Sequence, residues 1–495
     1  MGRGKAAIAL DIPRPIALEE GSADKQTAVY EALREAILKG LLKAGEHLPA
    51  TRALAERWRI SRGTVEIVFD RLRLEGYIER KRGSGSAVRA AVPDVLLKAA
   101  APSLAADASA HSSSRGAASP ESLTAASLAY DVPFIARMPD PSLLDAKAWR
   151  AGLANALGQL TPGELATGRT FGTPDLRRRV AQYLRAYRGI SCHAEDVIIT
   201  TGIRSAAEMA ARILLRRGEA VAVEDPGYLW ARRILEEAGA RLDFVPLDAA
   251  GIDVAYLRAY SKAKLAYVTP AHQAPLGITM TAERRLALLD WAVKTNAYII
   301  EDDYDSDFNY HASPLPAIKA IDRIERVIYC GSFNKTLFAD LRVAYCVIPR
   351  RLRERLSARW EFSGRAAGII EQAAVAHFIA QGHFARHLRL ARQTYQRRRD
   401  LLMFSLTQAA GYAPQIGGEQ AGFHLILWLP AGTSEADFCD AAARRGISLQ
   451  PLGMFCHAAV YPPAVLVGYA ALTEAKISYA GKTLGALLGR FYGAR

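Results

Sequence analysis

Five short apolar runs that alternate with helical patterns constrain the fold of this chain more than any other feature. They read DVIIT, AVAVED, LAYVTP, AYIIEDD and RVIYCGS, and they lie between residues 196 and 332. Strands that alternate with helices form a mainly parallel sheet with helices on both faces. We therefore predict an α/β domain over about residues 140–495. Its end, about residues 365–495 with GFHLILWLP and AVLVGYAAL, is predicted to be a smaller α+β lobe.

Two further zones precede this domain. Residues 25–89 read as three helices and a hairpin, and they hold fourteen Lys and Arg residues against eight Asp and Glu residues. The whole chain has a net charge of +14 and a pI near 9.6, which fits a nucleic-acid partner. Residues 90–139 are rich in Ala, Ser and Pro and show no sustained apolar period. We predict that this zone is a flexible linker.

The third predicted helix of the basic segment has the features of a DNA-reading helix. In the run RISRGTVEIVFDRLRLEGYI, Ser61 can cap the helix, and the apolar residues that follow face inward. Arg62 and Thr64 then lie on the exposed first turn, from which recognition helices contact base edges. Thr51 is the expected N-cap of the preceding helix, and Arg82 lies at the tip of a basic wing. A solvated basic surface is the alternative interpretation.

The ordered series LPATR, ISRGTV, LEGYI and RGSGS resembles the winged helix of GntR-type regulators over about sixty-five residues. The resemblance implies double-stranded promoter DNA as a partner. Arginine can read guanine bidentately, whereas wing residues more often position the fold on the backbone. The residues that the resemblance assigns to DNA binding are Arg52, Ser61, Arg62 and Thr64, with Arg82 and Gly83 of the wing near the backbone.

Cysteine usage and hydropathy exclude several other classes of protein. The five cysteines are odd in number and show no CxxC spacing, which argues against a disulfide framework or a zinc site. No apolar run approaches the roughly eighteen residues of a membrane helix, and the N-terminus lacks the apolar core of a signal peptide. We therefore expect a cytoplasmic chain with no metal site and no membrane partner.

The run RVIYCGSFNKTLFADLRVAYCVIP carries the candidate chemistry. Lys335 follows a predicted strand that ends at Ser332, and Arg342 precedes the next strand. A lysine amine can condense with an aldehyde, and desolvation or nearby cations favour that reaction. Ser332 and Arg342 both carry groups that could bind a phosphate. Because a single lysine in a turn is usually only solvated, this interpretation depends on the segments around it.

Two of those segments offer groups for a phosphorylated ring. Asp302 closes the strand AYIIEDD, at the edge where open α/β sheets bind ligands. A carboxylate there keeps a pyridine nitrogen protonated, although a metal site or a solvated turn is the alternative. In IITTGIRSAAEMAARIL a strand leads through a turn into a helix. Gly202, Ile203 and Arg204 can therefore bind phosphate with helix N-terminal amides.

Two loops after neighbouring strands supply candidate contacts to the ring. Tyr228 in EDPGYLW can stack on the ring, and His272 or Gln273 in YVTPAHQAPLGITM can contact a ring oxygen. For Tyr228 and His272, a role in packing alone is an equal alternative.

In this order, EDPGY, TPAHQAPLG, EDDYDSDF and GSFNK resemble segments of fold-type I pyridoxal-phosphate enzymes of the class I aminotransferase group. Together with the winged helix, they make the chain resemble the MocR subgroup of GntR regulators. The resemblance implies pyridoxal 5'-phosphate as cofactor and a homodimer that reads two half-sites. It implies an internal aldimine at Lys335, Asp302 at the pyridine nitrogen and Tyr304 at the ring hydroxyl. Ser332 and Arg342 would bind the phosphate.

Several positions depart from the pattern of the family. Ala339 and Asp340 replace a Pro-Gly pair before the arginine, and Leu466 stands where aminotransferases have a carboxylate-binding arginine. Trp230 stands where one type of regulator has an effector-binding arginine. Without those arginines, an amino acid would be poorly held. We therefore expect at most residual transamination.

Three functions remain open from the sequence. The favoured one is a transcription regulator in which the cofactor, or an amine effector at Lys335, modulates promoter binding. The second is a true aminotransferase or lyase with an appended DNA-binding domain. The third is a degenerate fold that binds DNA constitutively.

Overall fold

The computed structural model describes residues 25–38, 41–43, 45–74, 77–81, 85–88, 136, 138–166, 170–310, 315–360 and 367–493 of the chain. These residues form two compact units, of which the first holds α1 to β2 and the second holds η2 to α19. The predicted linker of residues 90–139 lies outside the described residues, except at positions 136, 138 and 139. Within the described ranges, no helix combines the length and the apolar character that a membrane span requires.

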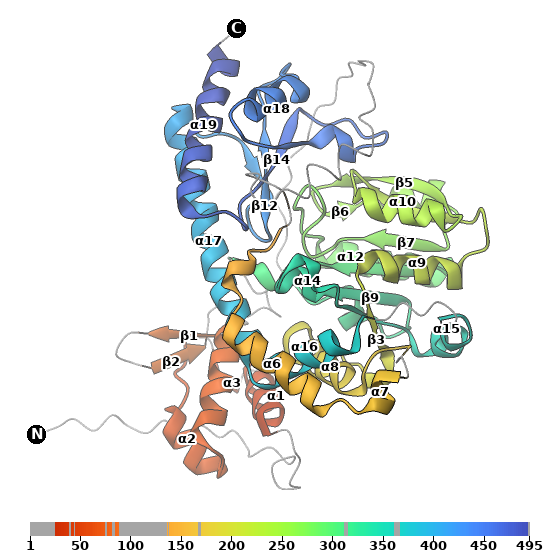
Figure 1. The fold of residues 1–495 in the computed structure, drawn as a ribbon, viewed down its shortest axis with the longest axis vertical. Helices are drawn as coiled ribbons and strands as arrows, with labels where there is room; N and C mark the ends of the chain where they lie inside the picture. The colour runs from red at the N-terminus through yellow and green to blue at the C-terminus, as the bar shows by residue number, and fades with distance from the viewer. Residues whose placement is uncertain are drawn as a thin grey trace, which may run out of the picture. The chain divides into compact units, whose positions relative to one another are not determined.

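Three helices and a hairpin make up the first unit (Figure 1). Its elements are α1 (Lys25–Leu38), α2 (Thr51–Trp58), α3 (Arg62–Leu74), β1 (Ile78–Lys81) and β2 (Gly85–Val88). Apolar side chains of α1 and α3 pack together in one core. The buried residues that these two helices contribute at helical spacing are Val29, Leu33, Ile37, Val65, Val68, Phe69 and Leu72. The predicted winged-helix order is therefore confirmed.

Helices α2 and α3 of this unit differ in how their N-termini are capped. Ser61 caps α3, because its hydroxyl accepts a hydrogen bond from the Thr64 amide at 3.1 Å. The prediction that Thr51 caps α2 is wrong: Thr51 is the first residue inside the helix, and Ala50 occupies the N-cap without a side-chain hydrogen bond. In the antiparallel hairpin, Ile78 lies opposite Val88. The wing tip at residues 82–84 lies outside the described residues.

An eight-stranded sheet forms the centre of the second unit. Its strands are β3 (Val197–Thr200), β4 (Ala220–Asp225), β5 (Arg241–Asp248), β6 (Gly251–Ile252), β7 (Leu265–Val268), β8 (Tyr298–Asp303), β9 (Val327–Ser332) and β10 (Ala344–Val347). They lie in the order β3-β10-β9-β8-β7-β4-β5-β6, and the neighbours from β9 to β5 are parallel. Strands β10 and β6 run antiparallel to their neighbours. The mainly parallel sheet is thus confirmed, and all five apolar runs contribute strands to it.

Both faces of this sheet are apolar, and helices cover both. Helices α9 (Ile203–Leu214) and α10 (Leu229–Glu237) pack on the face that holds Tyr267 and Ile300. Helices α11 (Val254–Tyr260) and α12 (Ala282–Lys294) pack on the opposite face, which holds Ile299. The other helices before α17 are η2 (Pro141–Leu143), α6 (Ala146–Gln159), α7 (Pro162–Ala166), α8 (Pro174–Arg188), η3 (Ala194–Asp196), η4 (Ser306–Phe308), α13 (Ile318–Ile321), α14 (Phe333–Thr336), η5 (Ala339–Leu341), η6 (Arg350–Leu352), α15 (Arg353–Trp360) and α16 (Ile369–Ala380), the last of which lies in the range predicted for the small lobe.

From α17 onward, the described residues of the predicted small lobe form an antiparallel sheet and three α-helices. The sheet order is β11-β12-β14-β13. The elements are α17 (His383–Ala410), β11 (Ile416–Gly417), β12 (His424–Trp428), α18 (Glu435–Ala443), β13 (Gln450–Pro451), η7 (Leu452–Phe455), β14 (Ala464–Gly468) and α19 (Glu474–Gly493). Helices α17 and α19 lie side by side (Figure 1). They approach closely at Gly485, where a Cβ atom would lie 2.5 Å from the carbonyl oxygen of Leu406.

A buried carboxylate helps to join the small lobe to the large sheet. Asp225, the last residue of β4, is 2% exposed. Its side chain accepts hydrogen bonds from the backbone amides of His457, Ala458 and Ala459, at 2.7, 2.8 and 2.9 Å. Arg232 adds an ion pair at 3.4 Å. The loop after η7 is therefore fixed beside the turn that leads to Tyr228.

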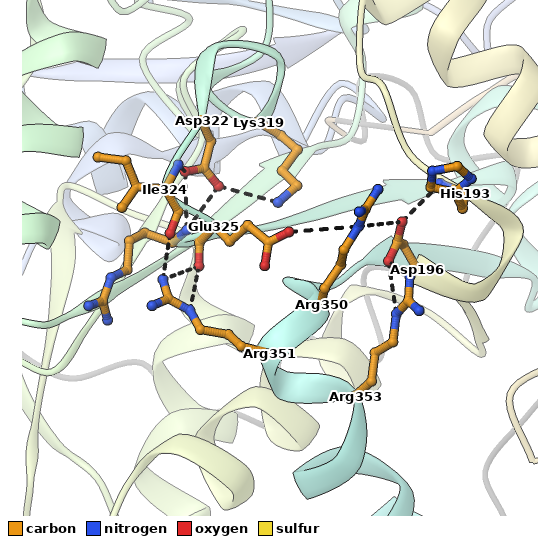
Figure 2. Close-up of polar contacts among 10 residues, drawn as sticks. His193, Asp196, Lys319, Asp322, Ile324, Glu325, Arg350, Arg351 and Arg353 are labelled. Atoms are coloured by element: carbon orange, nitrogen blue, oxygen red, sulfur yellow. Dashed lines mark hydrogen bonds and ion pairs between the residues drawn. The ribbon is translucent and has the colours of Figure 1, made fainter.

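A polar network ties the chain together at the edge where β3 and β9 begin (Figure 2). Asp196 precedes β3, accepts from the His193 amide at 2.9 Å and pairs with Arg353 at the start of α15. Asp322 accepts from the Val327 amide at 2.9 Å and from the Lys319 ammonium at 3.2 Å. These contacts fix the beginnings of the strands. The carboxyl ends of the same strands lie at the opposite edge of the sheet.

Candidate functional site

The exposed face of α3 is the candidate DNA interface of the first unit. Arg62 lies on this face and pairs with Glu66 at 2.8 Å, and the two side chains are 65% and 47% exposed. Ile67 is 52% exposed on the same helix. The face thus offers a cation and a methyl-bearing side chain, the groups that read guanine and thymine edges in a major groove.

The remaining predicted DNA contacts differ in their surroundings. Arg52 is exposed on α2 and pairs with Glu56 at 3.4 Å. The hydroxyl groups of Ser61 and Thr64 lie 2.8 Å apart, so each is partly engaged in the N-terminal turn of α3. Arg82 and Gly83 lie outside the described residues. The roles of all six residues stay predictions.

The second candidate site lies at the carboxyl edge of the large sheet. Ser332 ends β9 and caps α14, and its hydroxyl accepts from the Asn334 amide at 3.2 Å. Lys335 follows within α14 and is half-buried. In the parallel neighbour β8, Asp302 lies opposite Cys330, two residues before Ser332. The lysine and the carboxylate therefore leave the sheet from adjacent strands at one edge.

Asn334 joins the lysine turn to the predicted phosphate-binding turn. Its amide nitrogen donates to the Thr201 carbonyl at 3.3 Å, and its amide oxygen accepts from the Val343 amide at 2.8 Å. A Cβ atom on Gly202 would lie 3.7 Å from the same side chain. One asparagine thus holds together the turn after β3, the turn after β9 and the chain entering β10.

Helix α9 begins at this junction. Gly202 is its N-cap and makes no side-chain capping hydrogen bond, and Ile203 and Arg204 form the first helical positions. The unpaired amides of such a first turn, together with the helix dipole, favour an anion. Arg342 lines a pocket of about 420 Å³ together with Thr201 and Asp340. The arginine has a left-handed backbone with φ of 56°, which turns the chain into β10.

Asp302 is held from the neighbouring strand by a tyrosine. The phenol of Tyr267 donates to Asp302 Oδ2 at 2.5 Å, and the two residues are 2% and 5% exposed. Burial, followed by the charge of Asp302, raises the pKa of Tyr267 well above its ordinary value. The phenol is therefore a donor at every physiological pH, and it stabilises the ionised carboxylate.

Tyr304 belongs to a buried polar group that reaches the small lobe. Its hydroxyl lies 3.4 Å from His272 Nδ1, which lies 2.7 Å from a carboxylate oxygen of Asp305. His272 Nε2 lies 3.0 Å from the Gly418 carbonyl oxygen, so this nitrogen carries the donated proton. Burial raises the pKa of Asp305, and the neighbouring imidazole opposes that shift. A Cβ atom at Gly422 would lie 2.3 Å from the Asp305 carboxylate.

The side chain of Gln273 forms hydrogen bonds within its own loop and with the turn after β4. Its amide nitrogen donates to the Pro226 and Ala274 carbonyl oxygens, both at 2.9 Å, and its amide oxygen accepts from the Leu276 amide at 2.9 Å. The nitrogen also lies 3.2 Å from Glu224. These bonds brace the loop after β7 against β4. Contact of Gln273 with a cofactor stays a prediction.

Trp230, which departs from the family pattern, lies against Arg204 of the predicted phosphate-binding turn. The guanidinium of Arg204 lies over the ring of Trp230, 4.7 Å from its centroid. Trp230 lies in the first turn of α10, whose N-cap is the half-buried Tyr228. Tyr228 packs against the apolar cluster on the α9 face of the sheet. The predicted stacking residue is therefore on the same face as Asp302 and Tyr267.

Leu466 has an apolar environment. It is fully buried in β14, opposite Ile426 of β12, in a cluster with Leu276 and Phe455. A carboxylate would lose its hydration among these side chains without gaining a cationic partner from this position.

The groups at the sheet edge match the chemistry of pyridoxal phosphate. They comprise an amine, a carboxylate fixed by a tyrosine, a guanidinium and a helix start that no side chain caps. An aldehyde, a pyridine nitrogen and a phosphate need these respective partners. Within the described ranges, no cluster of side chains has the composition of a metal site. The residues therefore fit this cofactor.

Sequence reasoning did not identify Asn334, Tyr267 or Glu224 as parts of the site. Asn334 lies next to the lysine in GSFNK, so its position was a usable signal. Tyr267 is the polar residue of an otherwise apolar strand, LAYV. Such a residue needs a buried partner for its hydroxyl, although the sequence does not say which one.

Comparison with known proteins matches a family to each of the two units. Residues 25–88 match the family of bacterial regulatory proteins named gntR, and residues 144–484 match aminotransferase class I and II. The chain is 34% identical to the probable rhizopine catabolism regulatory protein MocR of Rhizobium meliloti, over 90% of each chain. It is 31% identical to the pyridoxine biosynthesis transcriptional regulator PdxR of Corynebacterium glutamicum, over 81% of this chain and 82% of that one.

Solved structures show the fold of the second unit independently. The kynurenine aminotransferase of Pyrococcus horikoshii superposes with a TM-score of 0.68 at 24% identity, over 76% of this chain and 95% of that one. The α-aminoadipate aminotransferase LysN of Thermus thermophilus superposes with a TM-score of 0.66, also at 24% identity, over 74% and 94% of the two chains. The second unit thus has the fold-type I aminotransferase fold. With its winged helix and its similarity to MocR, the chain belongs to the MocR subgroup of GntR-family regulators.

Proposed function

We propose that this regulator holds pyridoxal 5'-phosphate covalently at Lys335 and that the cofactor, or an amine effector that reacts with it, modulates promoter binding. One observation carries the proposal: Lys335, Asp302 and the uncapped start of α9 leave the large sheet at the same edge. The same chain carries a winged helix with an exposed basic turn. Occupancy of the first site can then be linked to binding at the second.

Each residue at the sheet edge has a separate task. When bound, pyridoxal phosphate supplies an electrophilic carbon and an electron-withdrawing ring. The amine of Lys335 is the nucleophile that holds it. The carboxylate of Asp302 keeps a proton at the ring nitrogen, while Arg342 and the α9 amides neutralise the phosphate. Tyr228 offers a face for stacking.

We further propose that this unit is a sensor with at most residual turnover. An aminotransferase must hold the carboxylate of its substrate in a fixed orientation. Here Leu466 lies in an apolar cluster, and the cation that lies over the Trp230 ring is the exposed Arg204. An amine without a carboxylate therefore suits the pocket better than an amino acid.

Promoter recognition is assigned to the first turn of α3. Arg62 lies where recognition helices meet base edges, and Arg52 adds a positive charge from α2. We propose that two copies of the chain read two half-sites, because a single winged helix contacts only a short segment of duplex.

The direct test is binding of the full-length protein to the DNA upstream of its own gene. Fluorescence anisotropy at fixed salt, with and without added pyridoxal phosphate, gives the affinity in both states. The Lys335→Ala protein is the control for covalent attachment. The proposal expects specific binding that changes with cofactor in the wild type and stays constant in the variant. Specific binding that ignores both the cofactor and amines would contradict the sensor model.

A further inference from the structure

We propose that Tyr267 is a positioning residue for the cofactor: its phenol holds the Asp302 carboxylate in the orientation and the ionised form that a protonated pyridine ring requires. This inference rests on the proposed binding of pyridoxal phosphate. It adds a residue that lies on a different strand from Asp302, within β7 of the large sheet.

The geometry places the phenol directly beside the carboxylate. Tyr267 lies on β7 opposite Ile300 of β8. Ile300 and Asp302 are two residues apart, so their side chains are on the same face of the sheet. Across this face the Tyr267 hydroxyl donates to Asp302 Oδ2 at 2.5 Å. The bond therefore crosses from one parallel strand to the next.

The energetics explain why the bond matters. Asp302 is 5% exposed, and burial without a donor would favour its neutral form. A neutral carboxyl could not pair with a protonated ring nitrogen. The hydrogen bond from Tyr267 favours the ionised form, and hydrogen bonds to charged groups are stronger than those between neutral groups. The phenol also restricts rotation of the carboxylate, so less freedom is lost when the cofactor binds.

The sheet contains a matched pair for comparison. Tyr329 of β9 donates to Oδ2 of Asp303 at 2.7 Å, and it is 2% exposed, as Tyr267 is. Asp303 follows Asp302 directly, so its side chain points to the opposite face, where it pairs with Arg188 at 2.5 Å. The two tyrosine–aspartate bonds are alike in the burial of the phenol and in the groups that they join. They differ in the ion pair that Asp303 makes with Arg188 and in whether the aspartate faces the cofactor site.

The experiment compares Tyr267→Phe with Tyr329→Phe in the full-length chain. Both variants keep the aromatic ring and lose one buried hydroxyl. Pyridoxal phosphate is titrated into each protein, and its visible absorption band and the quenching of protein fluorescence report binding. Tyr267→Phe is expected to weaken cofactor affinity by about tenfold and to shift the absorption band. Tyr329→Phe is expected to lower the melting temperature of the cofactor-free protein and to leave affinity within about twofold of the wild type.

A double-mutant cycle separates positioning from general damage. In an Asp302→Asn background, Tyr267→Phe should cause no further loss of affinity, because the interaction it removes is already absent. Unchanged affinity and absorption in Tyr267→Phe would overturn the inference while leaving the proposed function intact. Equal losses in the two tyrosine variants would do the same. A wild-type chain that binds no pyridoxal phosphate would overturn the proposed function as well.

Discussion

Glu224 should make the stability of the second unit fall as the pH rises. The residue is 2% exposed in β4, and its carboxyl accepts from the Thr269 hydroxyl at 2.7 Å and from the Thr269 amide at 3.2 Å. Burial raises its pKa from 4.5 to about 7, against the effect of these donors. The folded protein therefore holds a proton that the unfolded chain releases above its ordinary pKa.

The size of the effect follows from linkage. Because the folded state binds the proton more tightly, the stabilising contribution is complete below about pH 4.5 and is lost as the pH rises through about 7. Between about pH 5 and about pH 8, the free energy of unfolding should fall by roughly 2–3 kcal/mol on account of this one residue. Glu224→Gln removes the titrating group and keeps its size.

Urea unfolding at the two pH values, for the wild type and Glu224→Gln, measures this contribution. Five of the six tryptophans belong to the second unit, so their fluorescence reports mainly its unfolding. Glu236→Gln, at an exposed position of α10, controls for the loss of a charge. The stability difference between wild type and Glu224→Gln should change by roughly 2–3 kcal/mol between the two pH values. A difference that is the same at both would refute the argument from burial.

Three further changes test other parts of the structure. Lys335→Ala should abolish labelling by pyridoxal phosphate and borohydride, and labelling that persists in peptide maps would move the attachment to another lysine. Arg62→Ala should weaken binding to the promoter by about 1–3 kcal/mol relative to unrelated DNA in anisotropy titrations. An equal loss on both DNAs would make Arg62 a phosphate contact. Gly422→Ala should lower the melting temperature far more than Gly446→Ala. Both glycines have positive φ, but only at Gly422 would the new Cβ atom meet other atoms. Similar losses would mean that the close approach to Asp305 is unimportant.

The parts of the fold that repeat along the chain were predictable from sequence. Apolar runs such as AVAVED and RVIYCGS became buried strands, and the order of helices and hairpin in residues 25–89 followed from their apolar spacing. Lys335 and Asp302 were identifiable because each follows or ends such a strand. The failed cap at Thr51 shows the limit of local rules, because Ala50 took the capping position without a side-chain hydrogen bond.

Contacts between side chains from distant segments could not be predicted from the sequence, because they depend on how the elements pair and pack. The bond between Tyr267 and Asp302 requires that β7 and β8 be neighbours in one particular register, which apolar patterning alone does not define. Likewise, the stacking of Arg204 on Trp230 depends on how α9 and α10 pack. Hydrophobic periodicity indicates which face of an element is buried. It does not indicate which polar groups meet there.

The hydrogen bonds at Asp225 affect which substitutions residues 457–459 can accept. The carboxylate binds the backbone amides of residues 457–459. Every amino acid except proline supplies such an amide, so many substitutions at these three positions leave the donors in place. The constraint falls on the single aspartate. Cysteine can therefore be placed at Ala458 or Ala459 to carry a spectroscopic probe of the small lobe, while proline at either position removes the donor.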